Sequence, residues 1–333
     1  MKKKLVSIVA PVYNEEKTIK EFIARLMSST KPLSTQYNFQ FILVDDGSTD
    51  ASVAVMKQIL NTENRMEIVE LRKNYGQTSA LQAGLDHAEG EIIISLDSDL
   101  QHFPEEIPKF LEKIEEGYDI VCGWRHKRQE GIIRRWPSKI ANHLIRSISG
   151  LVIHDIGTTF RAYRAEIIRD IRLLGENHRF VPVFAKKAGA RITELPIQNI
   201  ERPQGKSNYG ISRTLNVFFD LFFLHFYMKY FDRPIRIFAK LALFLFTFFG
   251  LIWMLLFLLS LTKGISGVVR AHSGWFILSM ILLLSSLQLL MTGIIAEVLA
   301  RLYYSGGTSH SRNSTYRVRT VWKKESLIKK IIR

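Results

Sequence analysis

The chain has 333 residues, of which 47% are hydrophobic, and its formal net charge is +15 at pH 7. Such a charge fits three kinds of partner: nucleic acid, an anionic membrane surface or a phosphorylated ligand. Because the sequence contains no zinc-finger spacing, basic zipper or RNA-recognition motif, we predict no nucleic-acid partner. Its single cysteine, Cys122, cannot form an internal disulfide, which favours a reducing compartment and a buried strand position.

Up to about residue 236 the chain alternates apolar, strand-like runs with helix-like segments. The predicted strands are 5–10, 39–44, 66–71, 91–96 and 118–123, and the predicted helices are 15–28, 51–60, 78–88 and 104–116. This order predicts an α/β fold with a mostly parallel sheet covered by helices on both faces. In such sheets ligands bind beyond the carboxyl ends of the strands, so functional residues are expected there.

Polar and acidic residues follow three of these predicted strands. If these side chains meet at one edge of the sheet they repel one another, and a divalent cation and a nucleotide are natural partners for them. The three segments are Pro11-Val-Tyr-Asn-Glu15, Val44-Asp-Asp-Gly-Ser-Thr-Asp50 and Asp97-Ser-Asp-Leu-Gln101.

Asp97 and Asp99 form the sharpest of these motifs. Residues i and i+2 of a regular strand share a face, so both carboxylates are expected to point toward one site. Hard oxygen ligands suit Mg²⁺ or Mn²⁺, and such an ion neutralises the charge on a leaving nucleoside diphosphate. The alternative is that one of the two carboxylates only caps the helix predicted to begin near Pro104.

Asp46 is predicted to accept hydrogen bonds from the base or ribose of a nucleotide. The alternative for its segment is a turn and a helix cap, a role for which Ser48 and Asp50 are suited. Farther along, Ala80 and Gly84 lie four residues apart in a predicted helix. Their shared small face predicts close packing of that helix on the sheet.

Two later segments, 241–261 and 275–296, contain no charged residue and are long enough as helices to cross a bilayer. We predict transmembrane helices at 237–262 and 275–300, joined by an external loop at 263–274. Lys and Arg are concentrated outside that loop, so the positive-inside rule places both termini in the cytoplasm, in a multi-pass protein of the cell (inner) membrane. The remaining parts are a cytoplasmic catalytic domain at 1–210, an interfacial amphipathic region at 211–236 and a basic cytoplasmic tail at 301–333 that contacts anionic lipid.

These motifs together resemble glycosyltransferase family 2, whose members have the A-type, Rossmann-like nucleotide-sugar fold. The pattern, from about Ser7 to Arg236, is most similar to the polyprenyl-phosphate branch, which includes dolichyl-phosphate mannose synthases and bactoprenol glucosyltransferases. The resemblance implies inverting transfer of a sugar from a nucleotide sugar, for which UDP is our prediction, to polyprenyl phosphate. It also implies that the reaction takes place at the cytoplasmic face of the lipid bilayer.

The resemblance further assigns roles to residues. The nucleotide side consists of Pro11, Tyr13, Glu15, Val44, Asp46 and Asp97, with Arg202 and Lys206 in a loop that closes over the donor. The metal ligands are Asp97, Asp99 and Gln101, and the catalytic residues are Asp155, Arg125 and Asp97. From the residues themselves we predict that Arg125, Arg146 and Arg161 hold the acceptor phosphate, since bidentate arginines suit phosphate oxygens. The alternative for the basic segment 125–146 is a solvated surface.

Two details of this assignment depend on the residues themselves. A phosphate monoester is largely a dianion at neutral pH, because its second pKa is about 6. We therefore predict that Asp155 orients the acceptor or Arg161 more than it removes a proton. In the donor loop, many family members have Lys where this chain has Asn208. Lys206 is then the expected source of positive charge, and a simple flexible lid is the alternative.

Two other functions are weighed against this one. A processive polysaccharide synthase usually shows Gln-x-x-Arg-Trp and more spans, whereas this chain has no such motif after Asp155. A non-catalytic membrane scaffold or lipid-binding protein does not require Glu15, Asp46, Asp97, Asp99 and Arg125 together. The oligomeric state stays open, a homo-oligomer included.

Overall fold

The structure is a computed structural model. It describes residues 3–125, 146–147, 150–173, 175, 177–198, 200, 222–305 and 316–324. These residues belong to two compact units, one within Met1–Leu221 together with Asn313–Arg333 and the other within Phe222–Arg312. Each unit is described by itself.

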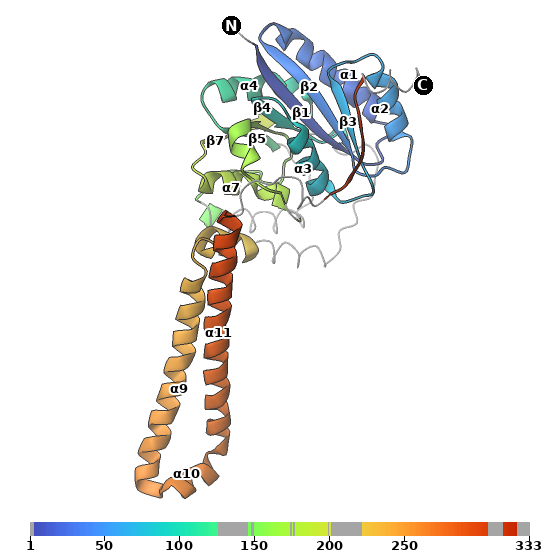
Figure 1. The fold of residues 1–333 in the computed structure, drawn as a ribbon. Coiled ribbons are helices and arrows are strands. Elements are labelled where there is room, and N and C mark those ends of the chain that lie inside the picture. Colours follow the sequence, from blue (N-terminus) through green and yellow to red (C-terminus); the bar gives the residue numbers. More distant parts are fainter. Residues whose placement is uncertain are drawn as a thin grey trace. The chain divides into compact units, whose positions relative to one another are not determined.

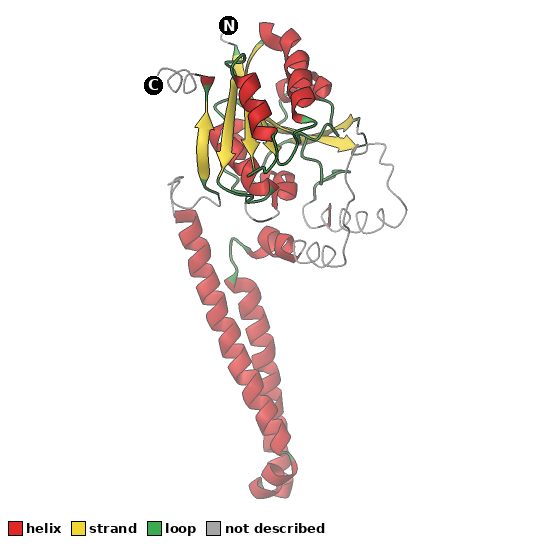
Figure 2. Ribbon diagram, turned by 90° about the vertical axis from the view of Figure 1, so that its right-hand side faces the viewer, coloured by secondary structure: helices red, strands yellow, loops and turns green. Residues whose placement is uncertain are grey.

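The first unit is built on an eight-stranded sheet with the order β7-β5-β6-β4-β1-β2-β3-β8 (Figures 1 and 2). β1 pairs in parallel with both β2 and β4, β2 with β3, and β5 with β7. Of the described strands, β6 and β8 run antiparallel to their neighbours. The strands are β1 Lys4–Val12, β2 Tyr37–Asp45, β3 Met66–Leu71, β4 Ile92–Ser95, β5 Ile120–Arg125, β6 Arg161–Arg164, β7 Ile192–Ile197 and β8 Val318–Trp322.

One face of the sheet carries the main hydrophobic core. Side chains alternate across β1, so Val6, Ile8 and Ala10 share this face and pack with Phe22 of α1 and Phe110 of α4. The helices of this unit are α1 Ile19–Thr30, α2 Ser52–Leu60, α3 Gln77–His87, α4 Ile107–Glu115, α6 Ala165–Arg169 and α7 Val181–Lys187. Three 3₁₀ turns join them: η1 Lys31–Thr35, η2 Pro104–Glu106 and η3 Asn177–Phe180.

Helix α3 covers the opposite face and lies unusually close to the sheet. A Cβ atom added at Gly84 would be 2.2 Å from Cγ1 of Val9 and 3.0 Å from Cγ2 of Val44. Only glycine fits at that distance, which confirms the predicted small face of this helix. The same contact shows that Val44 directs its fully buried side chain into the α3 interface.

The strand order determines where a ligand site can form. The chain passes from β1 to β2 on one side and reaches β4 on the other, so the order changes direction between β1 and β4. A crevice at the carboxyl ends of strands is expected at this switch point. Because β6 runs antiparallel to β4 and β5, the segment that precedes it, 155–160, reaches the same edge of the sheet.

The second unit contains two long apolar helices, α9 Ile235–Lys263 and α11 Ser273–Ser305, joined through α10 Ile265–Ala271. The stretches Ile235–Thr262 and Ser273–Leu302 are long and apolar enough to span a membrane. The two helices lie side by side (Figures 1 and 2). Gly293 lies at their interface, where an added Cβ would be 2.8 Å from Cβ of Phe238. Residues 222–230 are helical, and the rest of the predicted interfacial region before them lies outside the described residues.

The structure confirms the predicted fold class, and every predicted strand and helix of the sheet region is present. Cys122 is fully buried in β5, as expected, and burial raises the pKa of its thiol to about 12. The predicted basic tail needs a correction. Residues 318–322 form β8 and extend the sheet beside β3, because the alternating side chains of this segment suit a sheet edge as well as a lipid surface.

Candidate active site

The loop after β1 is held by the turn that follows β2. The Asn14 amide donates to Oγ of Ser48 at 3.0 Å, and the Glu15 amide donates to Oγ of Ser52 at 2.8 Å. Asn14 adopts a left-handed φ of 55°, which turns the chain sharply at this point. Tyr13 is 45% exposed, so its ring is available to a ligand at this edge of the sheet.

Asp46 lies buried at the end of β2. Its carboxylate accepts two backbone hydrogen bonds, from the Tyr75 amide at 2.7 Å and from the Gly76 amide at 2.9 Å. Burial nevertheless raises its pKa above the usual range of an aspartate. Asp46 therefore fixes the loop that connects β3 with α3. The neighbouring Asp45 closes its own turn by accepting from the amides of Gly47 and Ser48.

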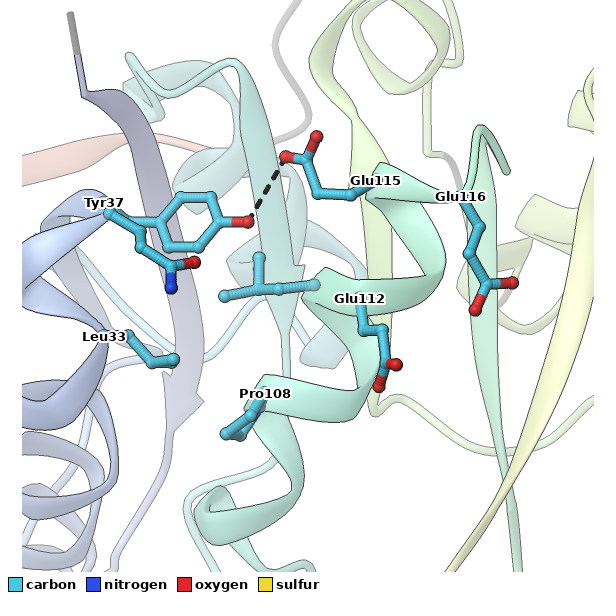
Figure 3. A pocket seen from close by; sticks show the side chains of 8 residues that line it. Leu33, Tyr37, Pro108, Glu112, Glu115 and Glu116 are labelled. Atoms are coloured by element: carbon cyan, nitrogen blue, oxygen red, sulfur yellow. Dashed lines mark hydrogen bonds between the residues drawn. The ribbon is translucent and has the colours of Figure 1, made fainter. Parts of the chain in front are cut away.

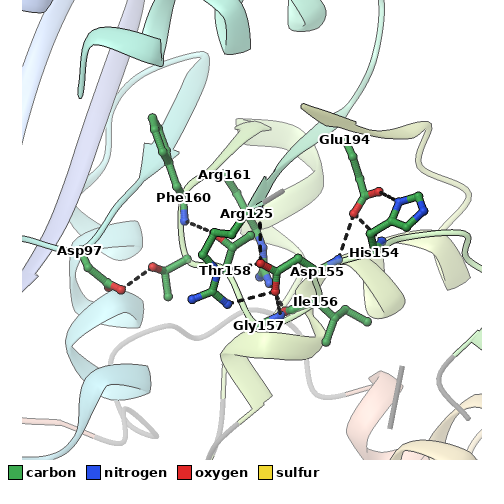
Figure 4. Close-up of polar contacts among 11 residues, drawn as sticks. Asp97, Arg125, His154, Asp155, Ile156, Gly157, Thr158, Phe160, Arg161 and Glu194 are labelled. Carbon is green, nitrogen blue, oxygen red and sulfur yellow. Dashed lines mark hydrogen bonds and ion pairs between the residues drawn. The ribbon is translucent and has the colours of Figure 1, made fainter. Parts of the chain in front are cut away.

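Asp97 lies between side chains from two different elements. Its Oδ1 accepts from Nε2 of Gln77 at 2.7 Å. Its Oδ2 accepts from Oγ1 of Thr159 at 2.6 Å, the contact drawn beside Asp97 in Figure 4. Oδ1 of Asp99 accepts from the Gln101 amide at 3.1 Å. Ser98, between the two aspartates, donates from its hydroxyl to the carbonyl of Pro11 at 2.8 Å, which ties this turn to β1.

The strand geometry predicted for Asp97 and Asp99 is wrong in one respect. β4 ends at Ser95, so both aspartates lie on the bend that follows, not on the strand itself. Leu100 within this bend has a φ of 61°, a strained value for a branched side chain and one that is found most often at functional sites. The capping alternative is not supported, since the N-cap residue of η2 is Phe103.

Arg125 and Asp155 form a two-point ion pair at the same edge (Figure 4). Nε of Arg125 lies 2.6 Å from Oδ2 of Asp155, and Nη2 lies 3.0 Å from Oδ1. The Gly157 amide also donates to Oδ1, at 3.2 Å. Asp155 is only 5% exposed, so the carboxylate mainly serves to hold the arginine in place. We predicted that Asp155 orients the acceptor or Arg161, and the arginine that it contacts in the structure is Arg125.

Arg161 is a structural residue in this fold. Its side chain is 1% exposed and donates to the carbonyls of Ile156 at 2.6 Å, His178 at 2.8 Å and Arg179 at 3.1 Å. A guanidinium enclosed by carbonyls cannot reach a lipid phosphate, so its predicted acceptor role is wrong. Arg146 is half-buried and donates from Nε to the carbonyl of Ile153 at 3.1 Å. Arg202 and Lys206 lie outside the described residues.

Sequence reasoning missed the residues that hold the loop of Asp155. Oε1 of Glu194, on β7, accepts from the amides of His154 at 2.7 Å and Asp155 at 3.2 Å. Its Oε2 lies 2.8 Å from Nδ1 of His154, whose ring stacks on Trp124 at 4.3 Å between centroids. The sequence carries no local signal for this network, because its members are brought together only by the pairing of β5 with β7.

His102 is a second residue that the sequence analysis passed over. It follows the motif of Asp97 and Asp99, is 2% exposed and packs at an angle against Phe160. Burial and the nearby positive charge of Arg125 lower its pKa to about 4, so the imidazole is neutral at physiological pH. Its Nδ1 has no hydrogen-bond partner among the described residues.

A separate hollow lies at the opposite edge of the sheet (Figure 3). It has a volume of about 450 Å³ and is bordered by Tyr37, at the start of β2, and by Glu112, Glu115 and Glu116, near the end of α4. Glu115 is paired with Lys4 at 2.7 Å. None of the predicted site residues lines it, and its acidic wall is unsuited to a phosphorylated ligand.

The carboxylates of Asp97 and Asp99 are hard oxygen donors that fit Mg²⁺ or Mn²⁺. Among the described residues no group of three or more His, Cys, Asp or Glu side chains could hold a metal ion. Both oxygens of Asp97 accept hydrogen bonds, from Gln77 and from Thr159, and a carboxylate oxygen that accepts a hydrogen bond can also coordinate a cation.

Solved structures of other proteins offer a limited likeness. Glucosyl-3-phosphoglycerate synthase from Mycobacterium tuberculosis, in complex with phosphoglyceric acid, aligns with a TM-score of 0.49 and 19% identity over 66% of this chain and 80% of that chain. The same enzyme in complex with Mn²⁺, uridine diphosphate and phosphoglyceric acid aligns with a TM-score of 0.49 and 17% identity, over 67% and 78%.

Comparison of sequences is more informative. The family model described as glycosyl transferase family 2 matches residues 7–172. The dodecaprenyl-phosphate galacturonate synthase of Rhizobium johnstonii is 39% identical over 91% of this chain and 90% of that protein. The undecaprenyl-phosphate 4-deoxy-4-formamido-L-arabinose transferase of Pseudomonas aeruginosa is 35% identical over 90% and 86%. Because the family model matches residues 7–172 and these relatives are similar over about nine-tenths of the chain, the protein belongs to glycosyl transferase family 2 and is a glycosyltransferase.

Proposed function

We propose that the protein transfers a sugar from a nucleotide-sugar donor to polyprenyl phosphate, with inversion at the anomeric carbon. The observation that carries this proposal is the 39% identity, over 91% of the chain, to a relative named for dodecaprenyl phosphate. The match includes the apolar helices as well as the sheet. A likeness of that extent favours the same class of lipid acceptor.

The chemistry is a single displacement. An oxygen of the acceptor phosphate attacks the anomeric carbon, the bond from that carbon to the diphosphate oxygen breaks, and its electron pair leaves with the nucleoside diphosphate. The attacking oxygen is already anionic at neutral pH, so no base is required. The ion pair supports this view, because both oxygens of the Asp155 carboxylate are engaged by Arg125, at 2.6 Å and 3.0 Å.

Arg125 is the proposed contact to the phosphates. Its pair with Asp155 uses Nε and Nη2, and a guanidinium has five N–H donors, so among the described residues Nη1 remains available for a phosphate oxygen. Held in this way, the guanidinium loses little freedom when it binds. On the nucleotide side we assign Pro11, Tyr13, Glu15 and Asp46, and we keep Arg202 and Lys206 as proposed donor-loop residues.

Asp97, Asp99 and Gln101 are the residues that we assign to a divalent metal. The ion would supply charge neutralisation for the departing diphosphate. The side chains of Gln77 and Thr159 hold Asp97 from both sides, at 2.7 Å and 2.6 Å, and so fix its direction. Because Asp97 is already held in place, its side chain needs little rearrangement when the metal binds.

We propose that the two apolar helices cross the cell membrane and that the sheet lies on its cytoplasmic side. The chain leaves the sheet unit before α9 and returns to it as β8, which pairs with β3. If both helices cross the membrane, the start of α9 and the end of α11 lie on the same side of it, and the sheet is on that side. The concentration of Lys and Arg on those flanks supports the cytoplasmic side.

The decisive experiment incubates the full chain in membranes with short polyprenyl phosphate and radiolabelled UDP-sugars and GDP-sugars. The expected result is a labelled lipid product and release of nucleoside diphosphate, both dependent on Mg²⁺ or Mn²⁺ and on the lipid. A processive synthase would instead extend a polysaccharide without a lipid phosphate. If none of the donors gives a labelled lipid in the presence of polyprenyl phosphate and metal, the proposal is wrong.

A further inference from the structure

The described end of the chain is fastened to the sheet next to the nucleotide side of the site. β8 forms the outermost strand, visible in red beside β3 in Figure 1. We name residues 316–323 the C-terminal clamp. Its strand pairs antiparallel with β3, from Ile68 opposite Trp322 to Leu71 opposite Val318.

Side chains add to the strand pairing. Arg319 donates from Nη1 to Oε1 of Glu70 at 3.1 Å, and Trp322 donates from Nε1 to Oε2 of the same glutamate at 3.0 Å. The Lys57 ammonium lies 3.8 Å from the centre of the Trp322 ring. Lys323 pairs with Glu67 at 3.1 Å. Because β8 has these side-chain contacts in addition to its backbone pairing, it is an integral strand of the sheet.

The clamp also holds the backbone immediately after β3. The Arg72 amide donates to the carbonyl of Arg317 at 3.0 Å, and the Arg72 carbonyl accepts from Nη2 of Arg319 at 3.0 Å. Both polar backbone groups of Arg72 are thus bound by the clamp. Three and four residues later, the amides of Tyr75 and Gly76 bind the Asp46 carboxylate.

A second contact holds the helix on the other side of this loop. The hydroxyl of Tyr316 donates to Oδ2 of Asp86, on α3, at 2.8 Å, and Tyr316 is 9% exposed. Asp86 also pairs with Arg172 at 3.0 Å. The clamp therefore holds the start of the loop 72–76 directly, through Arg72, and the far end of the helix that follows the loop, through Asp86.

From these contacts we propose that the C-terminal clamp is a positioning element of the donor site, with Tyr316 and Arg319 as its key residues. It sets the loop 72–76, and through that loop the direction of Asp46. The clamp follows α11 in the chain, so the donor site is linked covalently to the end of the apolar helix pair. This inference rests on the proposed function only for the identity of the ligand, a nucleoside diphosphate sugar.

The loop has little room to adapt on its own. Gly47, next to Asp46, has a φ of 72°, and an added Cβ would be 2.4 Å from the Lys73 carbonyl carbon. The turn after β2 therefore packs directly on the backbone of the loop 72–76. A displacement of Arg72 is transmitted to this contact and to both amides that bind Asp46.

The test compares Arg319→Ala and Tyr316→Phe with Lys324→Ala in the full chain. Lys324→Ala is a matched control, since it removes one positive charge from a partly buried position just beyond the clamp. We expect each clamp variant to raise the KM for the nucleotide sugar about three- to tenfold, in line with the loss of one or two hydrogen bonds. The KM for polyprenyl phosphate and the thermal midpoint of the clamp variants should equal those of Lys324→Ala.

Two further measurements keep the result interpretable. Hydrogen exchange at residues 72–76 should accelerate in both clamp variants and stay unchanged in Lys324→Ala. Binding of UDP and of GDP should weaken by the same factor as the donor KM rises. Because these two measurements need no lipid acceptor, they distinguish a failure of the clamp from a failure of the proposed function. A donor KM within twofold of the control, or equal rises for donor and acceptor, would overturn the inference.

Discussion

Arg125 and Asp155 meet through two hydrogen bonds, from Nε to Oδ2 at 2.6 Å and from Nη2 to Oδ1 at 3.0 Å. Their side chains are 16% and 6% exposed, so little water competes with the pair. Glu194 holds the backbone of the same loop through the amides of His154 and Asp155. Asp155 and Glu194 together therefore hold the Arg125 guanidinium in one orientation.

Asp155→Asn should lower kcat by about 100-fold, because an amide cannot balance the guanidinium, and breaking a buried ion pair costs about 3–5 kcal/mol. The shape of the pH–rate profile should stay the same if Asp155 positions Arg125. Loss of a basic limb in the variant would instead identify Asp155 as a general base. Asp119→Asn is the matched control, since Asp119 is also paired with arginines but lies before β5, at the other edge of the sheet.

Asp97→Asn and Asp99→Asn should each reduce kcat/KM by about 100-fold or more, since each removes a charged oxygen ligand. The concentration of Mn²⁺ needed for half-maximal rate should rise in both variants. The measurement is a metal titration of nucleoside diphosphate release after treatment with a chelator. Ser98→Ala, which removes the hydroxyl bound to the Pro11 carbonyl, should leave the metal requirement unchanged. Full turnover of the double variant without added metal would rule out these ligands.

His178 gives the sheet unit a stability that depends on pH. It is 3% exposed and its Nδ1 lies 2.7 Å from Oγ1 of Thr78. Burial, with help from the charges of Arg179 and Arg161, lowers its pKa to about 3, whereas an unfolded histidine titrates near about 6.5. Between these values the unfolded chain binds the extra proton. The free energy of unfolding therefore falls as pH drops through this range, by about 1.4 kcal/mol per pH unit.

The check is to follow thermal unfolding from pH 7.5 to pH 5 in the chain and in His178→Asn. The substituted amide keeps an acceptor for Thr78 and does not titrate, so the variant should lose less stability on acidification. Equal acid slopes for the two proteins would show that His178 does not contribute.

Gly293→Ala should loosen the pairing of α9 with α11, because the new Cβ would be 2.8 Å from Cβ of Phe238. Gly250→Ala is the matched control, as an added Cβ there meets nothing within 4 Å. Both substitutions favour the helix equally. Thermal unfolding of the full chain in detergent should show a lower midpoint for Gly293→Ala alone. A shift of the same size in both variants would contradict the close contact.

Much of the fold could be predicted from sequence because the information is local. The apolar runs that became β1 to β5 and the small face at Ala80 and Gly84 depend on residues a few positions apart. β6, β7 and β8 were not predicted, since polar or charged residues interrupt each of them and each is stabilised by partners far away in the chain. Trp322 meets Glu70 across 252 positions of sequence.

In the site too, features set by neighbouring residues could be predicted, whereas features set by distant residues could not. Asp97 and Asp99 could be recognised from an apolar run and a spacing, although the place where β4 ends was not evident. Arg161 was misjudged because an arginine near a phosphate site suggests a phosphate ligand. Its burial is decided by the carbonyls of His178 and Arg179, which approach from another part of the chain. The chemical role of a side chain could be inferred from its residue type, whereas its exposure to solvent could be known only from the tertiary structure.

The distance in sequence between β3 and β8 has a consequence for biosynthesis. During synthesis β3 is an open edge strand, and it stays so until the ribosome has produced both apolar helices and the strand after them. An unpaired edge strand is a template for aggregation, so a chain whose synthesis stops before β8 carries such an edge in its sheet.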